Sequence, residues 1–199
     1  MIFNLKDHFC RFKKMYIIFL LLMLVGLATG MLTAFKYTGE ITIKHLNDNV
    51  LVGFLEDKVG AFGLLFKRVF AFCVLFFIII VINIKKFTCF LNFFLILYES
   101  YLLGLNCAIF ILLFNISGII NVFLVYLPCH LIALIALMGL STIFCSSCFK
   151  LSRYKENIFS QFFWQQNSRS IIFFLSISFI SFLLEMILLP SFCSAFFIV

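Results

Sequence analysis

Charge is scarce in this chain. Only 12% of its 199 residues are charged, whereas 65% are hydrophobic and 31 residues are phenylalanine. No segment is long and polar enough to form a separate water-soluble domain, so we expect a single domain that covers residues 1–199. The net charge of +7 would suggest a nucleic-acid partner in a soluble protein. Here the basic residues flank apolar runs and form no patch with interleaved aromatic residues, so we expect no nucleic acid and a lipid bilayer instead.

The sequence also lacks the short motifs of the common enzyme classes. It contains no Walker loop, HExxH, GxSxG or dinucleotide-binding fingerprint. Cys145 and Cys148 have the spacing of a redox pair, but no βαβ pattern surrounds them and no second pair of ligands stands nearby. We therefore expect no enzyme activity, no catalytic residue, no metal and no cofactor.

The longest apolar stretch is residues 87–149, which contain no lysine, arginine or aspartate and only one carboxylate, Glu99. About 20 apolar residues are enough to cross a bilayer, so this stretch must fold back on itself inside the lipid. Its strongest loop signal is the sequence Asn-Ile-Ser-Gly at 115–118. A turn there divides the stretch into spans at 87–114 and 119–149.

This central stretch could hold two spans or three. Three spans of about 21 residues fit its length better, because two straight helices would each be longer than the roughly 30 Å hydrocarbon core. Three spans, however, would place the basic residues of the loop 150–169 outside, against the positive-inside rule. We therefore predict two long, tilted spans, the second kinked at Pro128, which lacks a backbone donor and clashes with the preceding turn.

We therefore predict that the whole chain is all-α and forms a polytopic transmembrane helical bundle of about five spans. A cleaved signal sequence would also begin with a basic segment, but the first apolar run is longer than is usual for signals, so we expect it to be retained. Residues 36–68 carry apolar residues at helical spacing and predict an amphipathic outer helix, and Pro190 should end the last span. The predicted spans are 15–35, 69–84, 87–114, 119–149 and 170–190, with a cytoplasmic loop at 150–169. The basic residues place the N-terminus in the cytoplasm and the C-terminus outside the cell membrane.

Three glycines in the predicted spans indicate close helix packing. Gly26 and Gly30 are four positions apart, so they share one helix face and let another backbone approach. Gly104 stands next to other small residues and has the same use.

Two carboxylates, Glu99 and Glu185, and one histidine, His130, lie inside predicted spans. Ionisable residues in the bilayer are rare and costly, and they usually face the interior of the bundle. Counting along straight helices places all three in the outer half of the bilayer, so we hypothesise one polar cluster in which burial favours protonation of one or both carboxylates. The cluster could be a proton or ion path, or it could hold neighbouring helices together by hydrogen bonds.

Four segments share an order of features with a known family. They are 24–30 (LVGLATG), 101–105 (YLLGL), 127–132 (LPCHLI) and 182–190 (FLLEMILLP). This order resembles the stage II sporulation protein M family over most of the chain. Its most specific parts are the proline break in the fourth span and the Glu…Pro ending of the last span. The chain departs from the family in having fewer glycines in the third and fourth spans and more phenylalanine and cysteine.

The resemblance implies a non-enzymatic integral membrane scaffold. Members of the family in spore formers anchor peptidoglycan-degrading partners during engulfment of the forespore. By this resemblance the chain would position membrane or cell-wall-associated partners through 36–68 and 150–169, and an oligomer is compatible with this role. The alternative is a transporter or permease subunit that uses the intramembrane carboxylates, for which a broken helix is typical.

Overall fold

The computed structural model describes residues 9–36, 61–85, 88–151 and 160–196. These residues are almost entirely helical and include no strand. In lipid this is expected, because a helix satisfies its backbone polar groups internally. The helices are α2 (Lys13–Lys36), α5 (Ala61–Ile82), α6 (Leu91–Asn121), the π-helix η2 (Val122–Tyr126), α7 (Leu127–Leu151) and α8 (Gln161–Phe196).

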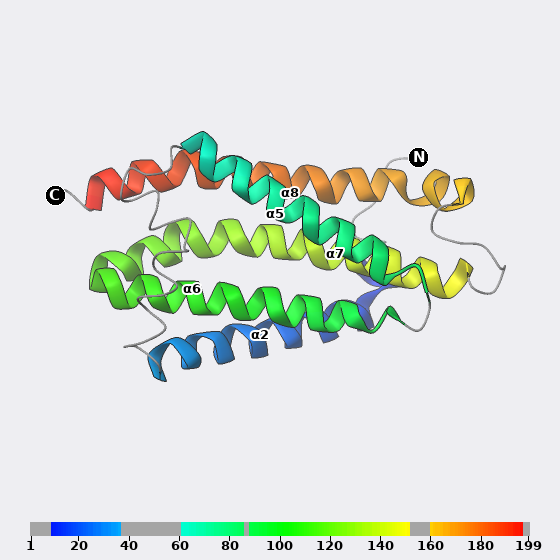
Figure 1. Cartoon of the computed structure of the whole chain (residues 1–199), viewed down its shortest axis with the longest axis horizontal. Helices are drawn as coiled ribbons and strands as arrows, with labels where there is room; N and C mark the ends of the chain where they lie inside the picture. The colour runs from blue at the N-terminus through cyan, green and yellow to red at the C-terminus, as the bar shows by residue number, and fades with distance from the viewer. Residues whose placement is uncertain (1–8, 37–60, 86–87, 152–159, 197–199) are drawn as a thin grey trace.

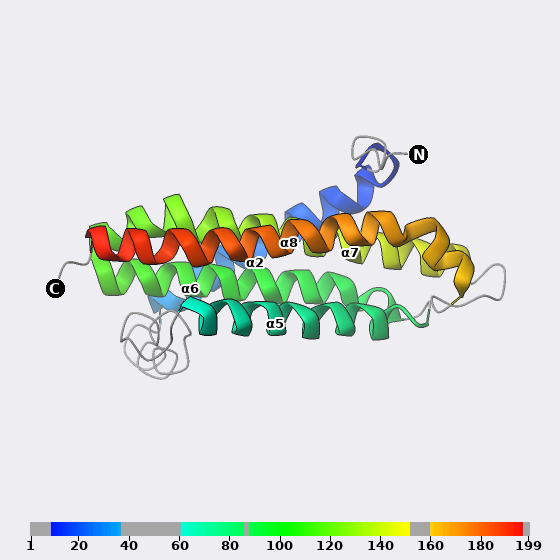
Figure 2. The ribbon, with the colours of Figure 1, turned by 90° about the horizontal axis from the view of Figure 1, so that it is seen from above.

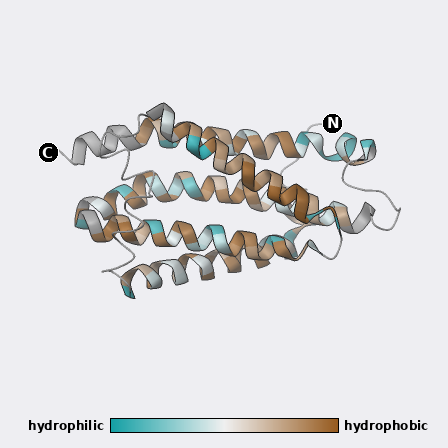
Figure 3. Ribbon diagram, viewed as in Figure 1, coloured by the Kyte–Doolittle hydropathy of each residue, from teal (hydrophilic) through white to brown (hydrophobic). Residues whose placement is uncertain are grey.

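Five helical stretches among the described residues are long and apolar enough to cross a membrane. Figure 3 shows hydrophobic residues along most of each helix. The central part of the chain supplies two of the five stretches, Leu91–Leu112 and Gly118–Cys148. The prediction of an all-α bundle with five spans is confirmed, and the structure fits an integral membrane protein.

The long helices lie side by side and alternate in direction (Figures 1 and 2). One end of the bundle holds the start of α5, the connection from α6 to α7, and the last turns of α2 and α8. α2 packs mainly on α6, α7 packs on α8, and α5 contacts both α7 and α8. This arrangement brings the start of α5 close to the end of α8.

Two irregular features lie before α7, one inside α6 and one directly after it. Asn115 has a non-helical backbone, with φ 50° and ψ −124°. Further on, η2 has a wider turn, in which the N–H of Leu127 bonds to the carbonyl of Val122. Pro128 follows directly and has no N–H to offer to that turn. The structure thus places Pro128 in the first turn of α7, where proline is tolerated, and the departure from α-helical geometry lies just before it.

The second span begins earlier than predicted. We expected a span at 69–84 with Lys67 and Arg68 in the flanking segment, but α5 begins at Ala61 and its spanning stretch includes both basic residues. The expectation was wrong because a long basic side chain can enter a bundle where a carboxylate meets it. Of the predicted amphipathic segment 36–68, residues 37–60 lie outside the described residues.

The last helix is longer at both ends than predicted. The predicted loop 150–169 contains the end of α7 and the start of α8, and only 152–159 lie outside the described residues. Pro190, expected to end the last span, lies within α8, which continues to Phe196. The spanning stretch itself ends at Leu188, close to the predicted end, and the helix continues past the proline because a proline removes only one hydrogen bond.

Glycines allow α2 and α6 to approach closely. A β-carbon on Gly30 would stand 2.1 Å from the carbonyl oxygen of Tyr101, and one on Gly104 would stand 2.3 Å from the carbonyl oxygen of Leu27. Gly26 faces the α6 backbone in the same way. No larger side chain fits at these positions unless a backbone moves. The structure places all three predicted packing glycines at this one interface.

The main apolar core lies where α2, α5, α6, α7 and α8 meet. Aromatic side chains fill it, among them Phe19, Phe72, Phe144 and Phe174. Gly139 of α7 makes room for Phe174, since a β-carbon there would stand 2.4 Å from the ring. This core holds α5 against α7 and α8 and so fixes the walls of the polar site described next.

Candidate functional site

Arg68 and Glu185 form an ion pair inside the bundle. Nη2 of Arg68, near the start of α5, donates a hydrogen bond of 3.2 Å to Oε1 of Glu185, near the end of α8. The Glu185 side chain is 1% exposed and that of Arg68 is 21% exposed. A charge this deeply buried is tolerated only with a partner, and removal of either partner leaves the other uncompensated. The pair therefore links the second and the last spanning helices.

His130 connects α7 to the same pair. Its Nδ1 lies 4.0 Å from Oε2 of Glu185 and 3.1 Å from the carbonyl oxygen of Tyr126. Because a carbonyl can only accept, Nδ1 carries a hydrogen in this contact. The Tyr126 ring is completely buried, its centre is 4.1 Å from that of the His130 ring, and its hydroxyl lies beside the Arg68 guanidinium. The ionic network therefore consists of Arg68, Glu185, His130 and Tyr126.

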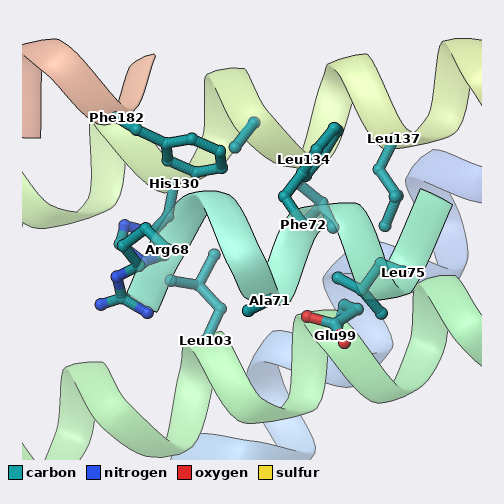
Figure 4. Close-up of a pocket in the computed structure, with 11 residues that line it drawn as sticks. Arg68, Ala71, Phe72, Leu75, Glu99, Leu103, His130, Leu134, Leu137 and Phe182 are labelled. Atoms are coloured by element: carbon teal, nitrogen blue, oxygen red, sulfur yellow. The ribbon is translucent and has the colours of Figure 1, made fainter. Parts of the chain in front are cut away.

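A cavity of about 100 Å³ lies beside the ionic network. Figure 4 shows Arg68 and His130 at one end of it and Glu99 towards the other. Within the network, Nε of Arg68 and Oε2 of Glu185 have no hydrogen-bond partner among the described residues. The other residues that line the cavity are hydrophobic: Ala71, Phe72, Leu75, Leu103, Ala133, Leu134, Leu137 and Phe182.

The structure brings together two members of the hypothesised cluster and separates the third. His130 and Glu185 meet, whereas Glu99 faces the cavity and makes no hydrogen bond or ion pair with any described residue. The spanning stretch of α6 begins at Leu91, so Glu99 lies about 12 Å along the helix from that end. It therefore lies just short of the middle of the roughly 30 Å core, whereas a count from residue 87 gave about 18 Å and placed it just beyond the middle.

Arg68 is the site residue that sequence reasoning missed. We assigned it to the segment that flanks the second span, together with Lys67. The sequence did hold a signal for a basic residue inside the bundle. Two carboxylates lie within predicted spans that contain no cation, and a buried carboxylate needs a partner. The basic residue nearest the outer end of an adjacent span was the natural candidate.

A cluster of thiols lies at the opposite end of the bundle. Cys89, before α6, contacts Cys145 and Cys148 of α7 in a small buried group. The three thiols form no disulfide with one another, and burial raises the pKa of the Cys89 thiol. Among the residues that the structure describes, no three histidine, cysteine, aspartate or glutamate side chains are placed to hold a metal ion.

Comparison with known proteins assigns no function to the chain, so the function is argued from the geometry of the site. The chain matches no protein-family model, no curated protein and no solved structure. The resemblance to the stage II sporulation protein M family therefore stays a prediction.

Proposed function

We propose that the protein is a multi-pass scaffold of the cell membrane that positions cell-wall-remodelling partner proteins. The observation that carries the proposal is the ion pair of Arg68 and Glu185, with His130 beside it. These three side chains hold three helices to one another, and α2 and α6 approach closely at their glycines. A bundle fixed by such contacts suits a rigid platform. The class of partner comes from the family resemblance alone.

The distribution of basic residues supports one orientation of this scaffold. Arg11, Lys13 and Lys14 at the start of α2, Lys85 after α5, and Arg169 near the start of α8 all belong to the same end of the bundle. By the positive-inside rule that end faces the cytoplasm. The N-terminus is then cytoplasmic, the C-terminus is outside, and the ionic network lies in the outer half of the membrane.

The first turns of α8 are the docking surface that the described residues offer. They carry Trp164, Gln165 and Arg169 in exposed positions at the cytoplasmic end of the last span. Aromatic and arginine side chains are enriched in protein interfaces. These turns also belong to the segment 150–169, which we expected to contact partner proteins.

Affinity purification from native membranes in mild detergent tests the proposal. A cell-wall hydrolase should co-purify with the wild-type chain, and Trp164→Ala with Gln165→Ala should lower its recovery about tenfold if these side chains anchor it. Ile172→Ala is the matched control, because Ile172 lies further along the same helix, within its spanning stretch, and is 61% exposed. A stable chain that purifies alone would contradict the proposal, as would equal losses in both variants.

A second candidate function, a transporter or permease subunit, is favoured by the cavity and its unpartnered Glu99. A carboxyl group on an intramembrane cavity is the feature that proton-coupled transporters use. Reconstitution in vesicles separates the two functions. A proton-dependent flux that is lost in Glu99→Gln would favour transport, whereas vesicles without flux that still bind the hydrolase would favour the scaffold.

A further inference from the structure

The two carboxylates inside the membrane have different surroundings. Glu185 is 1% exposed and is paired with Arg68. Glu99 lies on the wall of the cavity, and no described residue donates a hydrogen bond to it or pairs with it. Arg68 carries a single positive charge and already pairs with Glu185 at 3.2 Å, so it cannot balance the charge of a second carboxylate as well. Glu99 as a carboxylate would therefore give this mostly apolar site a net negative charge, with Arg68 across the cavity shared between two carboxylates.

An unbalanced charge of this kind is costly. Ionisable residues inside a membrane almost always pair with one another or mark a functional site. Something must therefore neutralise Glu99, and the choice lies between a metal cation and a proton.

The lining of the cavity disfavours a metal cation. Cations such as Ca²⁺ take several oxygen ligands, whereas the described lining residues other than Glu99 contribute no side-chain oxygen. The charged and titratable groups across the cavity from Glu99 are Arg68 of α5 and His130 of α7, with Glu185 of α8 behind them. The guanidinium of Arg68 would repel a second cation. A proton needs none of these ligands.

We propose that Glu99 is an exchangeable proton-binding site, neutral when the bundle is at rest, and that the cavity connects it to the end of the membrane where α5 begins. Arg68 marks that end, since it lies about 4.5 Å along the helix from Leu65, where the spanning stretch starts. Glu185 is the fixed anion of the site and Glu99 is the group that gains and loses a proton. This assignment depends on neither of the two functions proposed above.

Dicyclohexylcarbodiimide tests the assignment, because this apolar reagent modifies protonated carboxyl groups in apolar surroundings. The carboxyl O–H adds across one C=N bond of the reagent, and rearrangement gives a stable N-acylurea, so the peptide gains the full mass of the reagent. Purified full-length chain in detergent is treated over a range of pH and analysed by peptide mass spectrometry. Glu99 should be modified and Glu185 should not. Modification of Glu99 should fall about tenfold for each pH unit above its midpoint, as for loss of one proton.

The variant Glu99→Gln is the first control, because it retains the shape of a neutral carboxyl group and should fold while losing the modification. Sodium chloride is the second control and should give no protection. Three results would overturn the proposal: a folded chain in which Glu99 stays unmodified at every pH, equal modification of Glu185, or protection of Glu99 by sodium. Loss of partner binding or of flux would leave these outcomes unchanged, so the test is separate from the tests of function.

Discussion

The side chains of Asn83 and Asn92 hydrogen-bond to each other in both directions. Nδ2 of Asn83 lies 3.2 Å from Oδ1 of Asn92, and Nδ2 of Asn92 lies 2.9 Å from Oδ1 of Asn83. Each amide also donates to a backbone carbonyl, Asn83 to Ile79 at 2.7 Å and Asn92 to Cys89 at 2.9 Å. Both side chains are completely buried. A closed pair of side-chain amides thus joins the residue that follows α5 to the first turn of α6.

Breaking this pair on one side should destabilise the bundle. Asn83→Leu leaves the Asn92 amide without its partner, and we expect a loss of about 1–3 kcal/mol in the free energy of unfolding. The double variant Asn83→Leu with Asn92→Leu should be closer to the wild type, because no buried amide is left unsatisfied. Denaturant titration in detergent, followed by circular dichroism, measures both. Additive losses would show that the two amides do not depend on each other.

Enlarging Gly30 should separate α2 from α6. The added methyl group of Gly30→Ala would lie 2.1 Å from the carbonyl oxygen of Tyr101, so one backbone must move. We expect a loss of about 1–3 kcal/mol in unfolding free energy. Ala28→Val is the matched control, because Ala28 is exposed on the other face of the same helix. Equal stability of both variants would mean that this interface is looser than the structure indicates.

Orientation can be read from Cys10, which is exposed just before α2. If the N-terminus is cytoplasmic, a membrane-impermeant maleimide should label Cys10 only after the cells are permeabilised. Peptide mass spectrometry identifies which cysteine carries the label, so the other cysteines need not be mutated. Labelling of Cys10 in intact cells would reverse the orientation and place the ionic network in the inner half of the membrane.

The Cys89 thiol should react slowly and should respond to pH. The thiolate is the nucleophile, and burial raises the pKa of Cys89, so less of it is thiolate at neutral pH than for an ordinary thiol. Its alkylation by iodoacetamide should therefore lag behind that of exposed Cys10 and should speed up as the pH is raised. Time courses at several pH values, followed by mass spectrometry, measure this. Alkylation of Cys89 as fast as that of Cys10 at neutral pH would contradict its burial.

Sequence patterns predicted the helices well because lipid imposes a simple requirement on length and polarity. The five spans follow from apolar runs of sufficient length, and the charge distribution decided between two and three spans in the central stretch. The ends of the helices were less predictable. Pro190 lies inside α8 rather than at its end, because a proline weakens a helix locally without dictating where it stops.

The site was harder to predict because contacts between helices depend on how the helices face each other. Glu185 and His130 were recognisable as ionisable residues within apolar runs, but nothing local revealed that Arg68 would turn inwards to meet them. Similar depth also suggested that Glu99 would join them. Its place on α6 instead directs it to the far part of the cavity, away from Arg68 (Figure 4).

The central claim is that Arg68 and Glu185 hold α5 and α8 together inside the membrane, and a double-mutant cycle on this pair tests it most directly. The free energy of unfolding in detergent is measured for the wild type, Arg68→Met, Glu185→Leu and the double variant. Each single change should cost about 3–5 kcal/mol, because it leaves a buried charge alone, while the double variant should lose far less than the sum. A double variant whose loss equals the sum of the two single losses would show that the two residues do not interact.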